Sequence, residues 1–338
     1  MGNKHVSLKD LAKELNVSIS TVSRALRDHP DISAEVRKKV KQLAKARNYT
    51  PNPLAMGLLR QETRMIGVIV PDLVTHFYAS VISGIESFAN EKGFFTIVAS
   101  SEESLKKETE ALNNLLNARV DGIIACLSKE TKRYTHFKKL VEEKIPLVFF
   151  DRICLSDQVS CVSVDNKDAS RDVVKHLKSQ GYKRIAFISG PSHLNISKER
   201  LTGYFEGLKA CEYPESSYLI ETCNLSYNSA IAATKKLLDL PHPPDAIFCI
   251  NDTVAFAAMK EIKSRGLNIP NDIGLVGFTD EFHATVVDPT LTSVTHPTNK
   301  IGKKAAALFF DRLNNDKTAK LAVLKTKLVV RESSSRYN

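Results

Sequence analysis

The sequence lacks the cysteine and histidine patterns of metal and redox modules. It has six cysteines, but none forms a C-x-x-C pair and no histidine cluster has zinc spacing. Several cysteines lie inside apolar runs, at 123–126 and 247–250, where a free thiol packs as a small hydrophobic group. We therefore expect reduced cysteines, no bound metal and a cytoplasmic location.

Segments that would direct the chain to a membrane are also absent. Residues 1–10 are polar and lack the apolar core of a signal peptide. No stretch of 18 uncharged apolar residues occurs, so the sequence predicts no membrane-spanning helix.

The short motifs that identify common nucleotide-binding and hydrolytic enzymes are missing as well. The sequence has no G-x-x-x-x-G-K-[ST], no G-x-G-x-x-G after a strand, no G-x-S-x-G and no H-E-x-x-H. Four scattered histidines have no serine or cysteine partner at a recognisable spacing: His76, His193, His283 and His296. We therefore expect no catalytic residue and no cofactor, and an enzyme is the weaker hypothesis.

What the sequence does contain is an ordinary composition with an uneven charge. Of its 338 residues, 43% are hydrophobic and 25% are charged, which is typical of a soluble protein of two or three domains. Residues 1–64 carry 13 lysines and arginines against six acidic residues, whereas the other 274 residues have a net charge of only +3. This basic front end indicates contact with a polyanion, although a solvated basic surface would give the same count.

Three short helices are expected near the N-terminus. Ser7 and Asp10 form a capping-box pattern before the first helix, and Ser18 and Ser33 are N-cap candidates for the next two. Asn16 tolerates the left-handed conformation that a tight turn between the first two helices requires. Apolar residues recur at helical spacing in each segment. The pattern predicts a helix-turn-helix.

A linker with some helical character follows at 51–65. Pro51 and Pro53 end the third helix, and Pro53 is suited to begin a new helix over 54–60. Gly57 weakens that helix by about 1 kcal/mol, and so short a helix is marginal alone in water. We therefore expect this hinge helix to need a contact from outside.

From residue 66 onward, apolar runs alternate with amphipathic segments. Expected strands cover residues 66–70, 94–99, 121–127, 146–150, 184–189, 245–250 and 273–278. Expected helices cover residues 77–91, 105–116, 133–141, 168–179, 199–211, 228–238 and 253–264. This alternation is typical of doubly wound parallel sheets of the α/β class. The units are too many for one sheet, and the polar loop 151–160 is a candidate break between two lobes.

An ordered set of short motifs extends over almost the whole chain. Near the N-terminus the motifs are VSLKDLA (6–12), NVSISTVSRAL (16–26) and YTPN (49–52). In the body they include GVIVP (67–71), DR (151–152), RLTGY (200–204), ND (251–252), VGF (276–278) and PTLTSV (289–294). In this order they resemble the transcription regulators of the LacI/GalR type.

The resemblance implies a helix-turn-helix headpiece and a two-lobed core similar to periplasmic sugar-binding proteins. Three chain crossings would join the lobes, near 160–164, 291–296 and 321–326. The implied divisions are 1–50 for the DNA-binding domain, 51–65 for the hinge helix and linker, 66–163 with 295–323 for the N-terminal lobe, and 164–294 with 324–338 for the C-terminal lobe. Such regulators bind as homodimers to a pseudo-palindromic operator in double-stranded DNA, and they bind a small effector between the lobes.

In a helix-turn-helix, the early residues of the second helix reach the edges of the bases. Ile19 is suited to contact a thymine methyl group, and the Ser20 hydroxyl can donate or accept. Arg24 can pair with guanine, which contributes about 1–3 kcal/mol of discrimination; the alternatives are a phosphate contact or a solvated charge. The remaining short hydroxyl side chains suit phosphates, which position the protein: Ser18, Thr21 and Ser23.

The resemblance adds two residues of the linker to the DNA-binding set, Asn52 and Leu58. Leu58 matches the leucine with which the family wedges open the minor groove at the centre of the operator. One wedge from each subunit would kink the duplex. The alternative interpretation is that Leu58 and Leu59 are simply hydrophobic residues of the linker.

Polar residues follow several expected strands of the core. Ligands of doubly wound sheets bind beyond the carboxyl ends of the strands, so these residues are candidates for an effector site. The expected set is Asp72, His76, Phe77, Asp151, Arg200, Asn251, Thr279 and His296. Arg200 matches the effector-binding arginine of the family, and Thr279 stands where an aspartate is common in sugar-responsive members. An aromatic ring with planar polar groups suits a sugar or sugar derivative, and a nucleoside or a small acid would fit the same groups.

Two other polar positions have structural interpretations. Residues 165–166 are expected in a loop near a crossing, and Asp252 is expected as the N-cap of the following helix.

These features together predict a DNA-binding transcriptional regulator, and we expect it to be a repressor. The effector would control operator binding through an allosteric coupling of typically 1–3 kcal/mol. The alternative is a cytosolic small-molecule-binding protein or a sugar-modifying enzyme whose N-terminal module does not bind DNA. The hinge pattern at 51–60 argues against the binding protein, and the missing nucleotide motifs argue against the enzyme.

Overall fold

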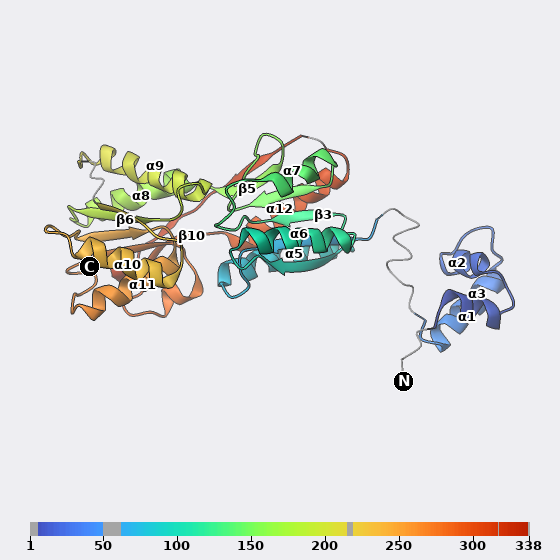
Figure 1. Cartoon of the computed structure of the whole chain (residues 1–338). Coiled ribbons are helices and arrows are strands. Elements are labelled where there is room, and N and C mark those ends of the chain that lie inside the picture. Colours follow the sequence, from blue (N-terminus) through green and yellow to red (C-terminus); the bar gives the residue numbers. More distant parts are fainter. Residues whose placement is uncertain (1–5, 50–61, 215–218, 317, 337–338) are drawn as a thin grey trace. The chain divides into compact units, whose positions relative to one another are not determined.

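The computed structural model describes residues 6–49, 62–214, 219–316 and 318–336. The chain divides into two compact units, Met1–Thr63 and Arg64–Asn338, each of which is described by itself (Figure 1). The hinge helix expected over 54–60, with Asn52 and Leu58, lies outside the described residues.

The first unit, the headpiece, contains the three expected helices: α1 (Leu8–Glu14), α2 (Ile19–Leu26) and α3 (Ala34–Ala46). The side chains of Ser7, Ser18 and Ser33 each accept a hydrogen bond from the backbone N–H three residues further on, so all three N-caps are confirmed. Asn16 has a φ of 52°, which confirms the left-handed turn between α1 and α2. A small apolar core joins the helices: Leu11, Ala12, Val22, Ala25, Val40 and Ala44.

The second unit, the core, contains two six-stranded sheets. The sheet of the N-terminal lobe has the order β11-β5-β4-β3-β1-β2, and all its pairings are parallel. Its strands are β1 (Met65–Val70), β2 (Phe95–Ser100), β3 (Gly122–Ala125), β4 (Leu147–Phe150), β5 (Ser160–Val164) and β11 (Leu321–Leu324).

The sheet of the C-terminal lobe has the order β12-β10-β9-β8-β6-β7. Only β12 runs antiparallel to its neighbour. The strands are β6 (Ile185–Ser189), β7 (Ile220–Thr222), β8 (Ala246–Cys249), β9 (Gly274–Thr279), β10 (Thr292–Thr295) and β12 (Leu328–Val329). Two parallel-rich, doubly wound sheets confirm the predicted α/β fold class.

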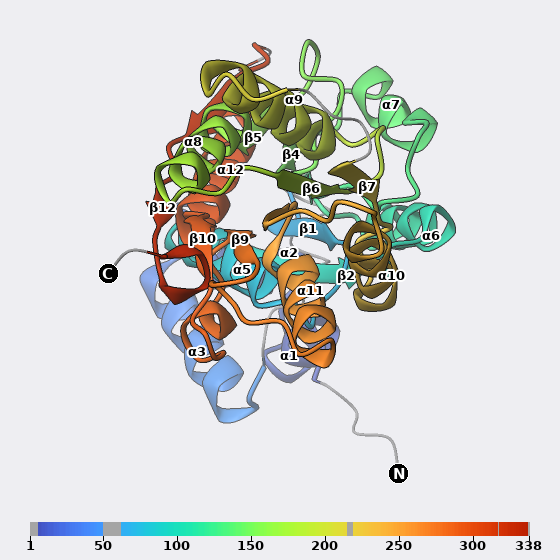
Figure 2. The same cartoon turned by 90° about the vertical axis from the view of Figure 1, so that its left-hand side faces the viewer.

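Helices cover both sheets. The N-terminal lobe carries α5 (His76–Glu91), α6 (Leu105–Asn117), α7 (Thr135–Glu142) and α12 (Thr298–Leu313), and the C-terminal lobe carries α8 (Asn166–Ser179), α9 (Asn195–Ala210), α10 (Tyr227–Leu238) and α11 (Asp252–Ser264). The described part of the core also includes the short 3₁₀ helices η2 (Phe282–Thr285) and η3 (Glu332–Ser334). The most extensive helix pairs are α8 with α9, α5 with α12, and α10 with α11 (Figure 2).

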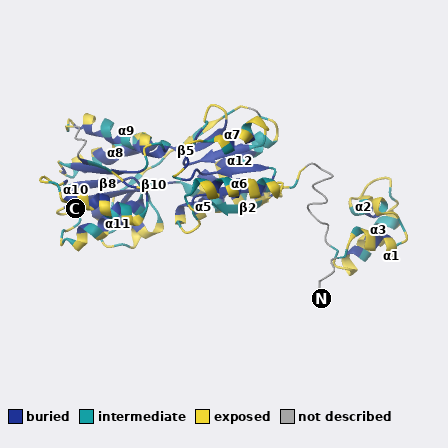
Figure 3. Cartoon of the chain, viewed as in Figure 1, coloured by how far each residue is buried: buried dark blue, intermediate teal, exposed yellow. Residues whose placement is uncertain are grey.

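The central strands are buried on both faces. Every residue of β3, β4, β5, β6 and β8 is buried (Figure 3). A strand covered by helices on both sides needs an apolar side chain at almost every position, and such runs are what made most of these strands predictable.

The chain passes between the two sheets three times. The first passage follows Val164, the second follows Thr295, and the third lies between Leu324 and Leu328. The segments expected to be plain crossings contain the strands β5, β10 and β11, because the crossing ends are themselves paired into the sheets. The loop 151–160 is not a break between the lobes, since β5 on its far side pairs with β4 in the same sheet.

All six cysteines are buried and unpaired. Across the described part of the chain, no helix is long and apolar enough to cross a membrane.

Candidate DNA-binding face and effector pocket

The start of α2 presents a small hydroxyl cluster beside an exposed apolar side chain. The Ser18 Oγ lies 2.7 Å from the Ser20 Oγ and 2.8 Å from the Thr21 Oγ1, and it accepts the Thr21 N–H at 3.0 Å. Ile19 between them is 49% exposed, although large aliphatic side chains are usually buried. The cap fixes the first turn of α2 and leaves Ile19 and Ser20 facing solvent.

Arg24 lies one turn further along α2 and is held only weakly. Its Nη1 is 3.8 Å from the Asp31 Oδ2, and about half of its side chain is exposed. An exposed ion pair of that length contributes little to stability, so the Arg24 guanidinium can exchange Asp31 for another partner at little cost. The side chain of Ser23, unlike that of Arg24, is held by a hydrogen bond: its hydroxyl accepts from the Arg27 Nη2 at 3.1 Å.

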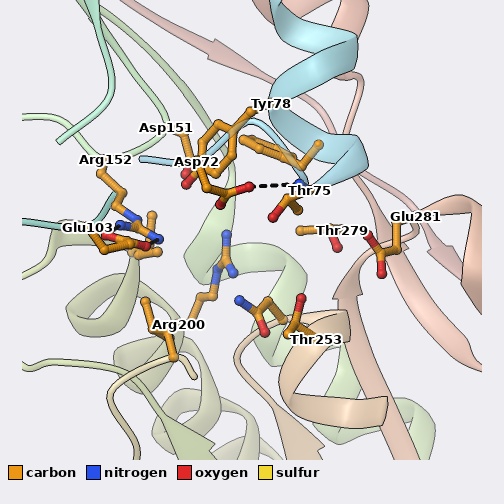
Figure 4. A pocket seen from close by; sticks show the side chains of 14 residues that line it. Asp72, Thr75, Tyr78, Glu103, Asp151, Arg152, Arg200, Thr253, Thr279 and Glu281 are labelled. Atoms are coloured by element: carbon orange, nitrogen blue, oxygen red, sulfur yellow. Dashed lines mark hydrogen bonds and ion pairs between the residues drawn. The ribbon is translucent and has the colours of Figure 1, made fainter. Parts of the chain in front are cut away.

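In the core, a cavity of about 110 Å³ lies at the carboxyl ends of strands from both lobes (Figure 4). From the N-terminal lobe it is lined by Asp72, Thr75, Phe77, Tyr78, Glu103, Asp151 and Arg152. From the C-terminal lobe it is lined by Ile196, Arg200, Leu225, Asn251, Thr253, Thr279 and Glu281. Four carboxylates and two guanidinium groups make it a strongly polar site.

Six of the eight residues expected at the effector site line this pocket: Asp72, Phe77, Asp151, Arg200, Asn251 and Thr279. His296 lies next to the pocket without lining it. Its buried ring packs 5.2 Å from the Phe77 ring, and its Nε2 is 3.8 Å from the Asp151 Oδ1. His76 is exposed at the start of α5 and does not line the pocket.

The Arg200 guanidinium is fixed from three sides. Its Nε donates to the Asn166 Oδ1 at 2.9 Å, its Nη1 donates to the carbonyl oxygen of Ile250, and its Cζ lies 3.7 Å from the centre of the Phe278 ring. Burial lowers the pKa of Arg200 to about 10, while the charge of Asp151 opposes this shift. Arg200 therefore stays protonated at neutral pH and is oriented before any ligand enters.

Asp151 faces Arg200 across the cavity (Figure 4). Burial raises the pKa of Asp151, while the positive charges of Arg200 and Arg152 lower it. Its backbone is tied to the other lobe, because the Asn195 Nδ2 donates to the Asp151 carbonyl at 3.1 Å and the Ile153 N–H donates to the Asn195 Oδ1 at 3.0 Å. This pair of hydrogen bonds joins α9 directly to the loop after β4.

Glu103 and Arg152 form a buried bidentate ion pair at the wall of the pocket. The Arg152 Nη1 and Nη2 donate to the two Glu103 carboxylate oxygens at 2.8 and 2.9 Å. Neither residue belongs to the set expected from the sequence. Arg152 could have been found because it directly follows Asp151 in the DR motif, whereas no local pattern points to Glu103.

The turn after β9 is clamped by a buried carboxylate. Thr279 has a φ of 129° and Asp280 a φ of 50°, which are unusual for residues other than glycine. The Asp252 Oδ1 accepts the Ser293 hydroxyl at 2.6 Å and its Oδ2 accepts the Glu281 N–H at 2.9 Å. Burial raises the pKa of Asp252 to about 6.

Known proteins share this combination of a helix-turn-helix and a two-lobed core. The family model of periplasmic binding proteins and the sugar-binding domain of the LacI family matches residues 63–330. The model of bacterial regulatory proteins of the lacI family matches residues 7–52. The chain belongs to the LacI family. Its members are DNA-binding regulators of transcription, so the regulator prediction is confirmed in preference to the enzyme.

Relatives in the LacI family match along nearly their whole length. The catabolite control protein A of Priestia megaterium is 35% identical over 92% of this chain and 94% of its own. The transcriptional repressor CytR of Escherichia coli K12 is 31% identical over 91% of this chain and 89% of its own.

Two solved structures of transcriptional regulators are similar over nearly the full chain. The complex of the regulator CelR with cellobiose is 29% identical, with a TM-score of 0.74 over 97% of this chain and 100% of that one. The Lac repressor dimer bound to operator and the anti-inducer ONPF is 25% identical, with a TM-score of 0.85 over 98% and 100%.

Two expectations about polar residues near the LacI-type pocket are wrong. Asn166 is not in a loop: it begins α8, is buried, and donates to the Glu199 Oε2 at 2.7 Å while it accepts from Arg200. Asp252 is not an N-cap, because Asn251 caps α11 by accepting the Val254 N–H at 2.9 Å. Both residues instead position groups that line the pocket.

Proposed function

We propose that the protein is a cytoplasmic repressor that binds a pseudo-palindromic operator as a homodimer and responds to a sugar or sugar derivative. The observation that carries the ligand part is the pocket between the lobes. In it Arg200 and Asp151 face each other across a cavity lined by both lobes. A ligand that contacts both lobes changes the position of one lobe relative to the other. Such a movement would couple ligand binding to operator binding, as an allosteric regulator requires.

The polar lining supports a polyhydroxylated ligand. Carboxylates accept from hydroxyl groups, and the Arg200 guanidinium donates in a fixed plane. Phe77 offers an apolar ring at the same cavity. One structurally similar regulator is solved with cellobiose. We therefore favour a sugar or sugar derivative over the nucleoside or small acid that the same groups would accept.

The DNA part rests on α2 and on the hinge. We propose base contacts by Ile19, Ser20 and Arg24, and phosphate contacts by the hydroxyl residues Ser18, Thr21 and Ser23. The proposed minor-groove wedge of Leu58 and the proposed DNA contact of Asn52 fall outside the described residues. Because the family binds DNA, a selection from random duplexes should recover an inverted repeat whose half-sites are one helical turn or a multiple apart.

Exposed apolar residues beside the pocket support the homodimer. Leu73 and Val74 follow β1, and Phe282 and Val286 follow β9; all four are exposed. Large apolar side chains at the surface supply contact area for a second copy of the chain, and one of the similar structures is a dimer. Sedimentation equilibrium is expected to give twice the chain mass of 37.5 kDa; a mass of one chain would contradict the dimer.

The ligand proposal is tested by thermal denaturation of the full chain with a panel of sugars, nucleosides and small organic acids. A ligand at 100 times its Kd stabilises the folded state by about 2.7 kcal/mol and raises Tm. We expect at least one sugar to raise Tm, and Arg200→Ala to remove the shift. Arg171→Ala, on α8 and outside the pocket lining, is the matched control. A shift caused only by nucleosides or acids, or one that survives Arg200→Ala, would contradict the proposal.

A further inference from the structure

A second basic surface lies on the headpiece, beside α3. It is a shallow groove of about 460 Å³, lined by Asp28, Ala34, Arg37, Lys38, Lys41, Gln42 and Lys45. Four of these side chains are cationic and one is acidic. The residues at the start of α2 that are proposed to read bases do not line it.

The lysines of the groove form one stripe along α3. Lys38, Lys41 and Lys45 are spaced by three and four residues, which places them on the same face of the helix. At 1.5 Å per residue the stripe is about 10 Å long. Duplex DNA carries one phosphate about every 3.4 Å of axis along each strand, so the stripe matches a run of about three phosphates.

Only part of this charge is neutralised within the headpiece. The Lys41 Nζ contacts both Asp28 carboxylate oxygens at 2.6 and 2.7 Å, and this hydrogen bond lowers the pKa of Asp28. In the described part of the headpiece, Lys38 and Lys45 have no ion pair, and the buried Arg37 Nε has no hydrogen-bond partner.

Other basic residues on or next to α3, unlike Lys38 and Lys45, are paired with acidic residues. Lys39, on a different face of the helix, pairs with Glu35 at 2.8 Å, and Arg47 at the C-terminal end pairs with Glu14 at 3.0 Å. Like charges three or four residues apart destabilise a helix. Repulsion between the lysines of the stripe therefore destabilises α3 in the isolated headpiece. A polyanion bound along the groove would offset this repulsion.

We propose that this groove binds the sugar–phosphate backbone of DNA independently of base sequence, as a contact separate from those of the reading end of α2. The groove borders Asp28, beyond the C-terminal end of α2. The eight residues of α2 place it about 12 Å from the start of that helix. The lysines supply point charges and Arg37 supplies a planar donor, both suited to phosphate oxygens. The inference rests on the DNA binding of the headpiece and adds a surface to it.

The test is the salt dependence of binding to a 40-base-pair duplex of random sequence, measured by fluorescence anisotropy between 50 and 200 mM KCl. Each phosphate contact contributes about 0.9 to the slope of log K against log salt. We compare the full-length protein with Lys38→Gln/Lys45→Gln, which breaks no ion pair, and with a triple variant that adds Lys41→Gln. The control Lys138→Gln/Lys235→Gln/Lys303→Gln removes the same charge as the triple variant from exposed positions of the core.

We expect the slope to fall by about 2 in the double variant and by nearly 3 in the triple variant, and to stay unchanged in the control. The ratio of affinities for a selected operator and for the random duplex should remain that of the unmodified protein. Circular dichroism checks that the headpiece stays folded. A slope unchanged in both groove variants, or reduced equally in the control, would overturn the proposal. Failure of the unmodified protein to bind any duplex would instead overturn the DNA-binding function itself.

Discussion

The headpiece and the core place their candidate functional residues in opposite ways. On the headpiece, Ile19 and Arg24 are about half exposed and are held by little beyond their own helix. In the core, Arg200 and Asp151 are buried and are fixed by partners far along the chain, such as Asn166 and Ile250 for Arg200. The exposed headpiece residues suit the proposed contact with a large rigid partner, and the buried pocket residues would enclose a small one.

The two proposed functions have different structural requirements. A duplex brings its own charge and shape, so the headpiece needs only exposed donors on a capped helix. A small ligand must be surrounded, so the core assembles side chains from several strands before the ligand arrives. Substitutions at packed or buried core positions should therefore act on folding stability and ionisation, those in the pocket on ligand binding, and those on the headpiece on DNA binding.

The largest effect is expected from Gly302→Ala in the core. The new Cβ would lie 2.1 Å from the Val81 carbonyl oxygen, where α12 crosses α5, and backbone on both sides prevents relaxation. We expect a loss of at least about 3 kcal/mol in the stability of the core, measured by urea unfolding.

The control for this substitution is Lys303→Ala, an exposed change on the same helix, for which we expect less than about 0.5 kcal/mol. Equal stabilities of the two variants would contradict the close packing of α5 and α12. A headpiece that lost stability together with the core would contradict the independence of the two units.

An effect of similar size, but dependent on pH, is expected from Asp252→Asn. The pKa of Asp252 is about 6 in the folded chain against 3.8 ordinarily, because the carboxyl group is buried. Between these values the folded state keeps a proton that the unfolded state has lost. Asp252 therefore stabilises the fold at low pH, and this contribution disappears as pH rises through 6.

The shift corresponds to about 3 kcal/mol at 1.36 kcal/mol per pH unit. The unfolding free energy of the unmodified protein, relative to that of Asp252→Asn, should fall by about 2 kcal/mol of this between pH 4 and pH 7. Circular dichroism is the suitable probe, since the chain has no tryptophan. A difference that is flat across this range would show that Asp252 ionises normally.

The smallest effect is expected from Arg24→Ala on the headpiece. It should reduce discrimination between a selected operator and a duplex changed at one guanine by about 1–3 kcal/mol, with the stability of the fold unchanged. Lys13→Ala, an exposed change on α1 outside the proposed DNA contacts, is the control. If both duplexes lost affinity equally, Arg24 would be a phosphate contact rather than a base contact.

Local sequence signals were sufficient for the headpiece. The serine caps and the left-handed Asn16 depend on residues three or four apart, and all were found in the expected places. The buried parallel strands were also predictable, because burial on both faces requires continuous apolar runs.

The effector pocket was only partly predictable, because it is assembled over long distances. Asp72 and Asn251 follow apolar strands and were found from that position. Glu103 lies in a polar loop, and its place in the wall depends on the loop after β2 bonding back to β1, through the Ser101 N–H to Val70 and the Glu103 N–H to Pro71. No local pattern contains such pairings, and the same reason hid β5, β10 and β11 at the crossings.

Operator affinity measured with and without the sugar that raises Tm tests most directly whether the buried pocket controls the exposed reading face. In the unmodified protein, we expect the sugar to change operator affinity by about 5–150-fold, the range of a coupling of 1–3 kcal/mol. In Arg200→Ala, we expect the same operator affinity with and without the sugar. An unmodified protein whose operator affinity ignores the bound sugar, or an Arg200→Ala variant that responds as fully, would contradict this division of labour.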